Sequence, residues 1–405
     1  MTKFFRYELL TWPEVDSLPR DTPLLIPFGE DYPRDRLSNA LGSPAQIGIL
    51  PAVPFGWARS GLQVPDSVLE VLVRQLLNSL RDDGFTRVFA LIPPGLHLGL
   101  GAETITLPTS LPSPRPPILP DNACGKVILI PIGHTEQHAY HLPMSTDTCI
   151  IDAISQGTAA TVPELAASLP VMPYGVSTHR QAFAGTLNTG GRAFEDFWIS
   201  VIDVLAARGF DRIYLISGHG GNCSFLTNVV KYAGERHPDI FSATTWLYLS
   251  GPEGSAALKK YRKSGLGGMG HAGELETALM LHLHPELVHM ERVIDEIDFI
   301  STPSYYMDWV EGGALVANPP WEDDTTSGAY GAGSLATAEN GRNWLEAAIS
   351  EKVAHVAEIH QQIERRSARR SERLAIRHEM LDADQCRENL EHRSQAPTRE
   401  MLVTD

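Results

Sequence analysis

The sequence predicts an α/β fold in which parallel β-sheets are covered by helices. Three observations lead to this prediction. Short runs of β-branched residues and leucine end in glycine, as buried strands often do, and apolar residues between them recur every three or four positions, as on one face of a helix. The same succession of runs occurs twice along the chain. Strand, helix and strand at this spacing form βαβ units, which require parallel pairing.

The first succession occupies the N-terminal part of the chain. Its runs are PLLIPFG at 23–29, LPAVPFG at 50–56 and DDGFTRVFALIPPG at 82–95. Between the last two runs, apolar residues recur at helical spacing: Val68, Leu72, Leu76 and Leu80. Gly84 follows them, at a position where a glycine typically ends a helix. Residues 1–102 are therefore predicted to form a partial α/β repeat.

The second succession repeats these three runs in the same order. They are VILIPIG at 127–133, LPVMPYG at 169–175 and ARGFDRIYLISGHG at 207–220. The helical stretch between the last two contains Phe194, Phe197, Trp198, Val201, Ile202 and Leu205, and ends at Gly209. We expect residues 126–350 to form a second domain, in which the candidate catalytic residues described below lie. Six prolines in 103–125 predict an extended linker, and 351–405 predicts a charged helical extension and tail.

Composition excludes several classes of protein. The 405 residues include 49 acidic and 33 basic side chains, a net charge of −16, so neither nucleic acid nor an anionic membrane is expected as the main partner. The four cysteines show no CxxC spacing, which predicts neither a disulfide framework nor a thiolate zinc site and fits a reducing cytoplasm. Because no apolar window has the length of a membrane span, a soluble cytoplasmic protein is expected.

The second repeat carries an insertion rich in metal-ligand residue types. Pro27 to Leu50 spans 23 positions and Pro131 to Leu169 spans 38, so the second repeat has 15 more residues after its first strand. This segment, GHTEQHAYHLPMSTDT, contains His134, Glu136, His138, His141 and Asp147. Glu, His and Asp at the carboxyl end of a parallel strand are typical of sites for zinc, manganese or iron. A polar surface loop is the alternative.

Two further clusters follow later in the chain. ISGHGGNCSF at 216–225 places His219 among glycines that allow a close backbone approach, and a phosphate-binding loop is the alternative. In MGHAGELETALMLHLHPELV at 269–288, Glu276 shares the apolar face of a predicted helix, where a buried carboxylate needs neutralising by a metal or an arginine. Glu274 is the weaker candidate, His271 either caps the helix or faces the same cavity, and His282 and His284 are interpreted as structural.

The first repeat serves as an internal control for these candidates. The positions aligned with Glu136, His138 and His219 are Tyr32, Arg34 and Pro94. The apolar framework is kept where the candidate ligands are absent, so these side chains are not needed to make the fold. We therefore expect the first repeat to bind no metal and to be catalytically silent.

These motifs resemble those of the creatininase family, in the branch that carries GHGGN. The matching blocks, in order, are IPIGHTEQHAYHLPMSTDT, LPVMPYGVSTHRQAFAGT, ISGHGGN, HAGELETALML and TSGAYGAGSLATAENGR. The resemblance covers roughly 125–350 and implies the layered parallel-sheet fold of creatininases. It also implies a metal-dependent amidohydrolase that cleaves a C–N bond of a small cyclic amide or formamide-like substrate by a metal-bridged hydroxide.

The resemblance implies a role for individual residues. A pair of divalent ions (Zn, Mn or Fe) would be held by Glu136, His138, Asp147, His219 and Glu276, with Asp147 bridging. Catalysis would involve Glu136, and His271 would be the proton donor. The N–H groups of Gly220 and Gly221 would assist an oxyanion. The remaining pocket residues would be Tyr174, Ser177, His179, Phe183 and Thr186.

The sequence departs from the family pattern at three places. Gly221 stands where creatininase itself has an acidic residue, which argues against creatinine as the substrate. Ala139 and Tyr140 replace a common Gly-Pro pair, and Ala278 replaces a usual serine. These differences indicate a reshaped pocket.

Alternative functions stay open at this point. A mycofactocin-type peptidase or a deformylase would use the same ligands on another substrate. A non-enzymatic binding protein would lack ligands, and an iron-dependent oxidoreductase would contain one redox-active iron instead of two redox-silent ions. The family implies a homo-oligomer, from dimer to hexamer, in which the silent N-terminal repeat would occupy the position of a neighbouring subunit.

Overall fold

The computed structural model describes residues 1–109, 118–178, 182–309 and 312–394. It divides into two compact units, Met1–Ala357 and Glu358–Asp405. The first unit contains every candidate site residue. Its elements form two separate parallel sheets and a small antiparallel pair, as the sequence predicts for an α/β fold.

The N-terminal sheet has five parallel strands in the order β1-β3-β2-β4-β5. The strands are β1 (Lys3–Arg6), β2 (Leu24–Pro27), β3 (Gln46–Ile49), β4 (Val88–Ile92) and β5 (Thr104–Thr106). The helices of this region are α1 (Trp12–Asp16), α2 (Arg34–Ala40) and α3 (Asp66–Asp82). The central strand β2 is wholly buried, which explains its unbroken apolar sequence. Helix α3 buries Leu72, Leu76 and Leu80, as their spacing predicts.

The central sheet has four parallel strands in the order β7-β6-β8-β9. The strands are β6 (Val127–Ile132), β7 (Ala166–Ser168), β8 (Arg212–Ser217) and β9 (Phe241–Thr244). Its helices are α4 (Thr146–Thr161), α5 (Gly191–Ala207) and α6 (Gly220–Arg236). Helix α5 buries the aromatic and aliphatic face that the sequence predicts. The predicted parallel α/β fold is confirmed.

The strand in the middle of each predicted repeat lies earlier than expected. LPAVPFG and LPVMPYG follow β3 and β7 instead of forming them. Each block contains two prolines, which lack the N–H group that a ladder requires. Only a single bridge continues the pairing in each case, Phe28 with Val53 and Ile132 with Met172.

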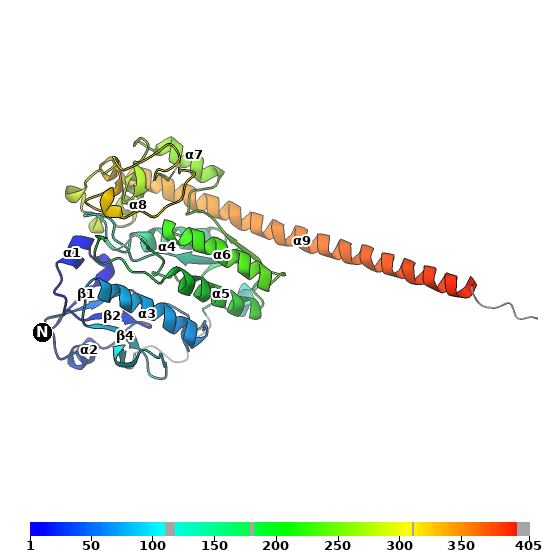
Figure 1. Ribbon diagram of the computed structural model, residues 1–405, viewed down its shortest axis with the longest axis horizontal. Helices are drawn as coiled ribbons and strands as arrows, with labels where there is room; N and C mark the ends of the chain where they lie inside the picture. Colours follow the sequence, from blue (N-terminus) through cyan, green and yellow to red (C-terminus); the bar gives the residue numbers. More distant parts are fainter. Residues whose placement is uncertain (110–117, 179–181, 310–311, 395–405) are drawn as a thin grey trace, which may run out of the picture. The chain divides into compact units, whose positions relative to one another are not determined.

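The two sheets share a topology. Strand order β3-β2-β4-β5 in the first corresponds to β7-β6-β8-β9 in the second, and the two isolated bridges occur at aligned sequence positions. This agreement supports an internal repeat, which stays a prediction. Helices α3 and α5 lie side by side between the sheets (Figure 1), and one apolar core contains residues of both sheets.

The proline-rich stretch 103–125 differs from a simple linker. It begins with β5, which pairs with β4 and so belongs to the N-terminal sheet. The short helix Asp121–Ala123 follows near its end, whereas 110–117 lies outside the described residues. Both sheets belong to the unit Met1–Ala357, so this stretch connects two parts of one compact body.

The remaining elements of the first unit follow β9. They are α7 (Pro252–Tyr261), β10 (Met269–His271), α8 (Glu274–Leu283) and β11 (Tyr330–Gly331), with β10 and β11 antiparallel. Short 3-10 helices occupy Tyr7–Leu9, Gly101–Glu103, Pro285–Leu287, Met290–Arg292, Trp321–Asp323 and Gly333–Leu335.

The charged C-terminal helix begins earlier than the predicted position 351. Helix α9 is Ala338–Ser394, and its first turns belong to the first unit. Trp344 is fully buried there, and its indole N–H donates to the Ala257 carbonyl at 3.2 Å. The described residues include no helix with an apolar stretch long enough to cross a bilayer.

Candidate metal centre

The five predicted metal ligands come from different elements and meet at one place. Glu136 and His138 lie in the loop after β6, and Asp147 lies in the first turn of α4. His219 precedes α6 directly after β8, and Glu276 lies in α8. All five side chains are buried. Strands β6 and β8 are neighbours, so their carboxyl ends bring the first four ligands to one edge of the sheet.

The ligand atoms form two groups that share Asp147. In the first group, His219 Nδ1 lies 2.8 Å from Glu136 Oε2 and 3.3 Å from Asp147 Oδ2. In the second, His138 Nε2 lies 3.1 Å from Asp147 Oδ1 and 3.9 Å from Glu276 Oε2. Each oxygen of Asp147 therefore faces a different group. This arrangement is what a bridging carboxylate between two metal ions requires.

Backbone carbonyls select which nitrogen of each histidine faces its group. His138 Nδ1 donates to the Glu136 carbonyl at 3.0 Å, and His219 Nε2 donates to the Val176 carbonyl at 2.9 Å. Once each ring has lost its second proton, as metal binding would require, the lone pairs are on His138 Nε2 and His219 Nδ1. These are the nitrogens that face the carboxylates. Such outer contacts are typical of histidine metal ligands.

The charges of the cluster also fit divalent cations. Burial alone would lower the pKa of His138, but Asp147, Glu276 and Glu136 outweigh it and raise the pKa to about 9. Burial would also lower the pKa of His219, but Glu136 and Asp147 outweigh this effect and raise the pKa well above its usual range. Protons on both rings thus offset the carboxylate charge. Two divalent ions would take over that role and displace the protons.

Glu276 has an unusual environment for a carboxylate. Burial raises its pKa to about 7, although His138 acts in the opposite direction. Its Oε2 accepts the backbone N–H of Ala272 at 2.6 Å. The sequence left an arginine partner open as an alternative. Among the described residues, the ionic partner of Glu276 is His138.

Gly221 is required for the orientation of His219. A Cβ atom at this position would collide with His219 Nε2 and with the Val176 carbonyl oxygen, the two atoms joined by the orienting hydrogen bond. At Gly220, by contrast, the nearest atom to a Cβ would be a ring carbon of Trp246 at 3.9 Å. Both glycines begin α6, where backbone N–H groups lack partners within the helix.

His271 lies against the second group. Its ring centroid is 4.3 Å from that of His138, and its Nε2 donates to the Gln137 carbonyl at 2.7 Å. The Nδ1 lone pair is then the free acceptor position. Burial and the positive charge of His138 lower the pKa of His271 to about 3, so the ring is neutral near pH 7.

His134 also lies close to the first group, but it differs from the ligands. Its ring stacks on His219 at 4.5 Å, and its Nδ1 accepts the Gly175 N–H at 2.9 Å. With the lone pair of Nδ1 engaged, a neutral ring carries its proton on Nε2 and has no second lone pair for a metal. His134 is therefore placed as a neighbour of the ligand set.

Several other acidic and histidine residues have structural contacts. Glu274 accepts the backbone N–H groups of Lys263 and Ser264, in keeping with its weaker candidacy. His141 is 2.9 Å from the Thr277 hydroxyl, and burial lowers its pKa to about 4. His284 is partly exposed and lies 3.4 Å from Glu286.

The predicted substrate-binding residues are scattered. Tyr174 is buried in the apolar core, and its hydroxyl donates to the Pro51 carbonyl in the N-terminal region, away from the ligand groups. Ser177 is buried next to Val176, the residue that orients His219. His179 lies outside the described residues. Phe183 packs against Trp321, and Thr186 accepts the backbone N–H of Gln137 at 3.0 Å.

Comparison with known proteins identifies the family of this chain. A family model described as creatinine amidohydrolase, that of the creatininases, matches residues 119–356, more than half of the chain. The chain belongs to the creatininase family. A mycofactocin precursor peptide peptidase of Mycobacterium ulcerans is 30% identical over 238 residues, 57% of this chain and 84% of that protein.

Two other relatives are similar over the same region of the creatininase fold. Creatinine amidohydrolase of Pseudomonas putida is 28% identical over 183 residues, 42% of this chain and 68% of that protein. A solved structure of creatininase with manganese shares 24% identity, covers 59% of this chain and 92% of its own, and has a TM-score of 0.50. That likeness shows the fold. The family membership predicted from the five motifs is confirmed.

Residues 1–118 lie outside the creatininase match, yet they contact the loop that carries the ligands. The Met144 N–H donates to the Leu10 carbonyl at 2.9 Å, and the Ser145 N–H donates to the Glu8 carbonyl at 3.0 Å. The indole N–H of Trp12 donates to the Ser327 carbonyl at 2.8 Å. The N-terminal region thus supports the loop next to Asp147.

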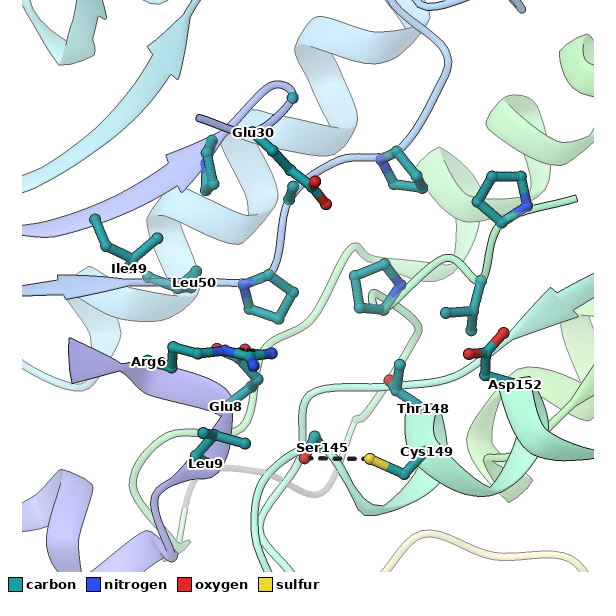
Figure 2. A pocket seen from close by; sticks show the side chains of 18 of the residues that line it. Arg6, Glu8, Leu9, Glu30, Ile49, Leu50, Ser145, Thr148, Cys149 and Asp152 are labelled. Carbon is teal, nitrogen blue, oxygen red and sulfur yellow. Dashed lines mark hydrogen bonds and ion pairs between the residues drawn. The ribbon is translucent and has the colours of Figure 1, made fainter. Parts of the chain in front are cut away.

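A cleft of about 1610 Å³ lies on another side of α4 (Figure 2). None of the five predicted ligands lines it. Thr148, Cys149 and Asp152 of α4 face Arg6 and Glu8 of the N-terminal region across this space. Helix α4 therefore presents Asp147 to the two groups of ligand atoms, and it presents Thr148, Cys149 and Asp152 to the cleft.

Sequence reasoning missed several residues near the centre. Gln137 orients His271, and its position within the EQH motif was the available signal. Trp321 packs on His271 with ring centroids 4.9 Å apart. Tyr248 and Trp309 lie in segments without a recognisable pattern, so only the tertiary structure identifies them.

Proposed function

We propose that this creatininase-family chain is a metal-dependent amidohydrolase that binds two divalent ions and cleaves a C–N amide bond. The observation that carries the proposal is the position of Asp147, whose two oxygens face two separate groups of ligand atoms. Glu136 and His219 complete one group, and His138 and Glu276 complete the other. Zinc, manganese and iron are the ions that this donor set suits.

The chain's own residues supply orientation and proton transfer. When bound, the two ions would acidify a water molecule and polarise the substrate carbonyl. Glu136 and Asp147 hold negative charge at the centre. Because the Gln137 carbonyl fixes Nε2 of His271, its Nδ1 is the nitrogen that would pass a proton to the leaving nitrogen. The N–H groups of Gly220 and Gly221 begin α6 and suit a developing oxyanion.

A small cyclic amide or a formamide-like molecule is the substrate class we propose. The ligand-bearing side chains are nearly buried, with at most 5% of any of the five exposed, which suits a small substrate better than a folded protein. Similarity to a mycofactocin precursor peptide peptidase supports a second candidate, hydrolysis of an unfolded peptide. Both reactions use the same metal chemistry.

The assembly and location of the chain complete the proposal. We expect a small-molecule substrate, a cytoplasmic location and a homo-oligomer between dimer and hexamer. The contacts of the N-terminal region with the ligand-bearing loop support its proposed role as a substitute for a neighbouring subunit. Light scattering of the full chain tests this role, because a hexamer like that of simpler relatives would contradict it.

Metal analysis combined with turnover tests the proposed reaction. Purified protein loaded with Mn²⁺ or Zn²⁺ is expected to bind two ions and to hydrolyse hydantoin or N-formylglycine, with amine release as the measurement. Glu136→Ala and His219→Ala should reduce turnover to background, whereas His282→Ala, on the exposed face of α8, should not. Turnover of an unstructured peptide alone would favour the peptidase. Absence of turnover in all three classes with both ions bound would contradict the proposal.

A further inference from the structure

Two buried hydrogen-bond donors lie close to the metal ligands. Tyr248, between β9 and α7, is fully buried, and its hydroxyl has no hydrogen-bond partner among the described residues. The indole nitrogen of Trp309 is also buried and has none within the same part of the chain. Their ring centroids are 4.9 Å apart. A buried donor left unpaired is costly, so two at one place indicate a group that the chain does not supply.

Tyr248 is held next to the segment that carries His219. The N–H of Leu247 donates to Cys223 Sγ at 3.4 Å, and that thiol donates to the His219 carbonyl at 3.7 Å. Leu247 has a φ of +49°, a left-handed conformation that is costly for leucine. Its carbonyl is fixed by the Thr245 hydroxyl at 2.8 Å. These contacts hold Leu247 in its strained conformation, and that conformation fixes the position of the next residue, Tyr248.

Trp309 is held next to the second ligand group. Its backbone N–H donates to the Met269 carbonyl at 2.8 Å, in the strand that ends at His271. The preceding residue, Asp308, forms an ion pair of 2.6 Å with Arg262. Tyr248 and Trp309 therefore meet between the segment of His219 and the segment of His271.

The chemistry of the pair selects an uncharged acceptor. Burial, reinforced by the carboxylates of Glu276 and Asp147, raises the pKa of Tyr248 well above its usual range and keeps the phenol protonated. An indole nitrogen can only donate. The same carboxylates disfavour an anion, and Arg262, whose charge could offset one, is paired with Asp308. A carbonyl oxygen flanked by the two aromatic rings satisfies both donors.

We propose that Tyr248 and Trp309 form a subsite for a second carbonyl oxygen of the substrate, beside the carbonyl that is hydrolysed. This inference rests on the proposed function and narrows its substrate class. Substrates with two carbonyls, such as cyclic imides, hydantoin-like rings or short acylated amides, fit the subsite. Simple lactams and simple formamides do not fill it.

Hydroxamates provide the probe, because they chelate metal ions through one end. Malonic and succinic monoamide hydroxamates carry a second carbonyl one or two methylenes away, and butano- and pentanohydroxamate are alkyl counterparts without it. Calorimetry on the Zn²⁺-loaded full chain should show at least one amide probe binding about tenfold tighter than its alkyl counterpart. Tyr248→Phe and Trp309→Phe should each remove most of this preference, and Tyr232→Phe, an exposed tyrosine of α6, should leave it intact.

The outcomes separate this inference from the proposed function. If neither ions nor hydroxamates bind, the metal centre itself is wrong. If they bind without a preference, or if both variants keep the preference, only the subsite is wrong, and the two donors hold ordered water. If the variants fail to fold, NMR of the wild-type protein decides the question. The indole N–H resonance of Trp309 should then shift with the amide probe and not with the alkyl probe, and equal shifts would contradict the subsite.

Discussion

At the scale of single residues, the proposed metal centre depends on groups that are not predicted ligands. The carbonyls of Glu136 and Val176 decide which nitrogen of His138 and His219 is available. Gly221 leaves the space in which the second of these contacts forms. Removing such outer contacts typically lowers metal affinity by about 10-fold to 100-fold. The site is therefore sensitive to changes that leave every ligand in place.

Gly221→Ala is expected to weaken metal binding without unfolding the protein. The new methyl group would displace the ring of His219 or the Val176 carbonyl. We expect a loss of about 10-fold to 100-fold in the affinity of one of the two sites, measured by competition with a chromogenic chelator. Gly234→Ala is the matched control, because a Cβ at this position of the same helix meets no atom within 4 Å. Equal affinities of the two variants would contradict the role of Gly221.

Metal binding is expected to release protons. At pH 7 the metal-free protein holds protons on His138, whose pKa is about 9, and on His219, whose pKa is also raised. Loading both ions should release about two protons from the rings and a further fraction from Glu276, whose pKa is about 7, so affinity should rise as the pH increases from 6 to 9. Calorimetry in two buffers of different ionisation enthalpy measures the number released. Affinity that is independent of pH would show that these rings are already neutral.

At the scale of elements, helices deliver carboxylates to the carboxyl ends of strands. Helix α4 presents Asp147 between the two groups, and α8 presents Glu276 to only one. The neighbouring face of α4 lines the separate cleft with Asp152 (Figure 2). The two carboxylates of α4 thus have different surroundings although they are five positions apart.

Substitution of the two carboxylates that helices α4 and α8 present to the proposed centre should have different effects. Asp147→Asn is expected to weaken both sites, because each oxygen serves one group, whereas Glu276→Gln should leave about one ion bound per chain. Elemental analysis after gel filtration gives the stoichiometry. Asp152→Asn on α4 is the control and should retain two ions. If Asp147→Asn lost a single ion, the bridging assignment would be wrong.

At the scale of the whole first unit, one core joins the two sheets. Phe55 of the N-terminal region is fully buried against Phe197 and Trp198 of α5, with ring centroids 6.3 and 6.1 Å away. Shared apolar burial of this kind makes the two sheets unfold together. The N-terminal region therefore contributes to the stability of the proposed metal centre although it provides none of the predicted ligands.

Phe55→Ala is expected to destabilise both sheets equally. The loss should be about 3–5 kcal/mol of unfolding free energy, as for other large-to-small core changes. Urea denaturation followed by tryptophan fluorescence and by circular dichroism should give coincident transitions. Val71→Ala, on the exposed face of α3, should change stability by less than about 0.5 kcal/mol. Separate transitions for the two probes would show that the sheets are independent.

The predicted fold follows from local patterns. Apolar runs ending in glycine, and helical spacing such as that of Leu72, Leu76 and Leu80, are visible in a single stretch of chain because backbone periodicity determines burial. The two proline-containing blocks show the limit of this reasoning. Their apolar residues suggest strands, but Pro170 and Pro173 cannot donate to a ladder, and the strand lies before them.

The sequence by itself determined the types of side chain in the proposed metal centre and the parallel α/β architecture, because the motifs and periodic patterns that predict them each lie within a short stretch of chain. Only the tertiary structure decided that Asp147 lies between two groups, that carbonyls orient the histidines, and that Tyr248 and Trp309 meet beside them. Those relations join positions far apart in the chain. They depend on how the sheet and its helices pack, so local sequence patterns do not predict them.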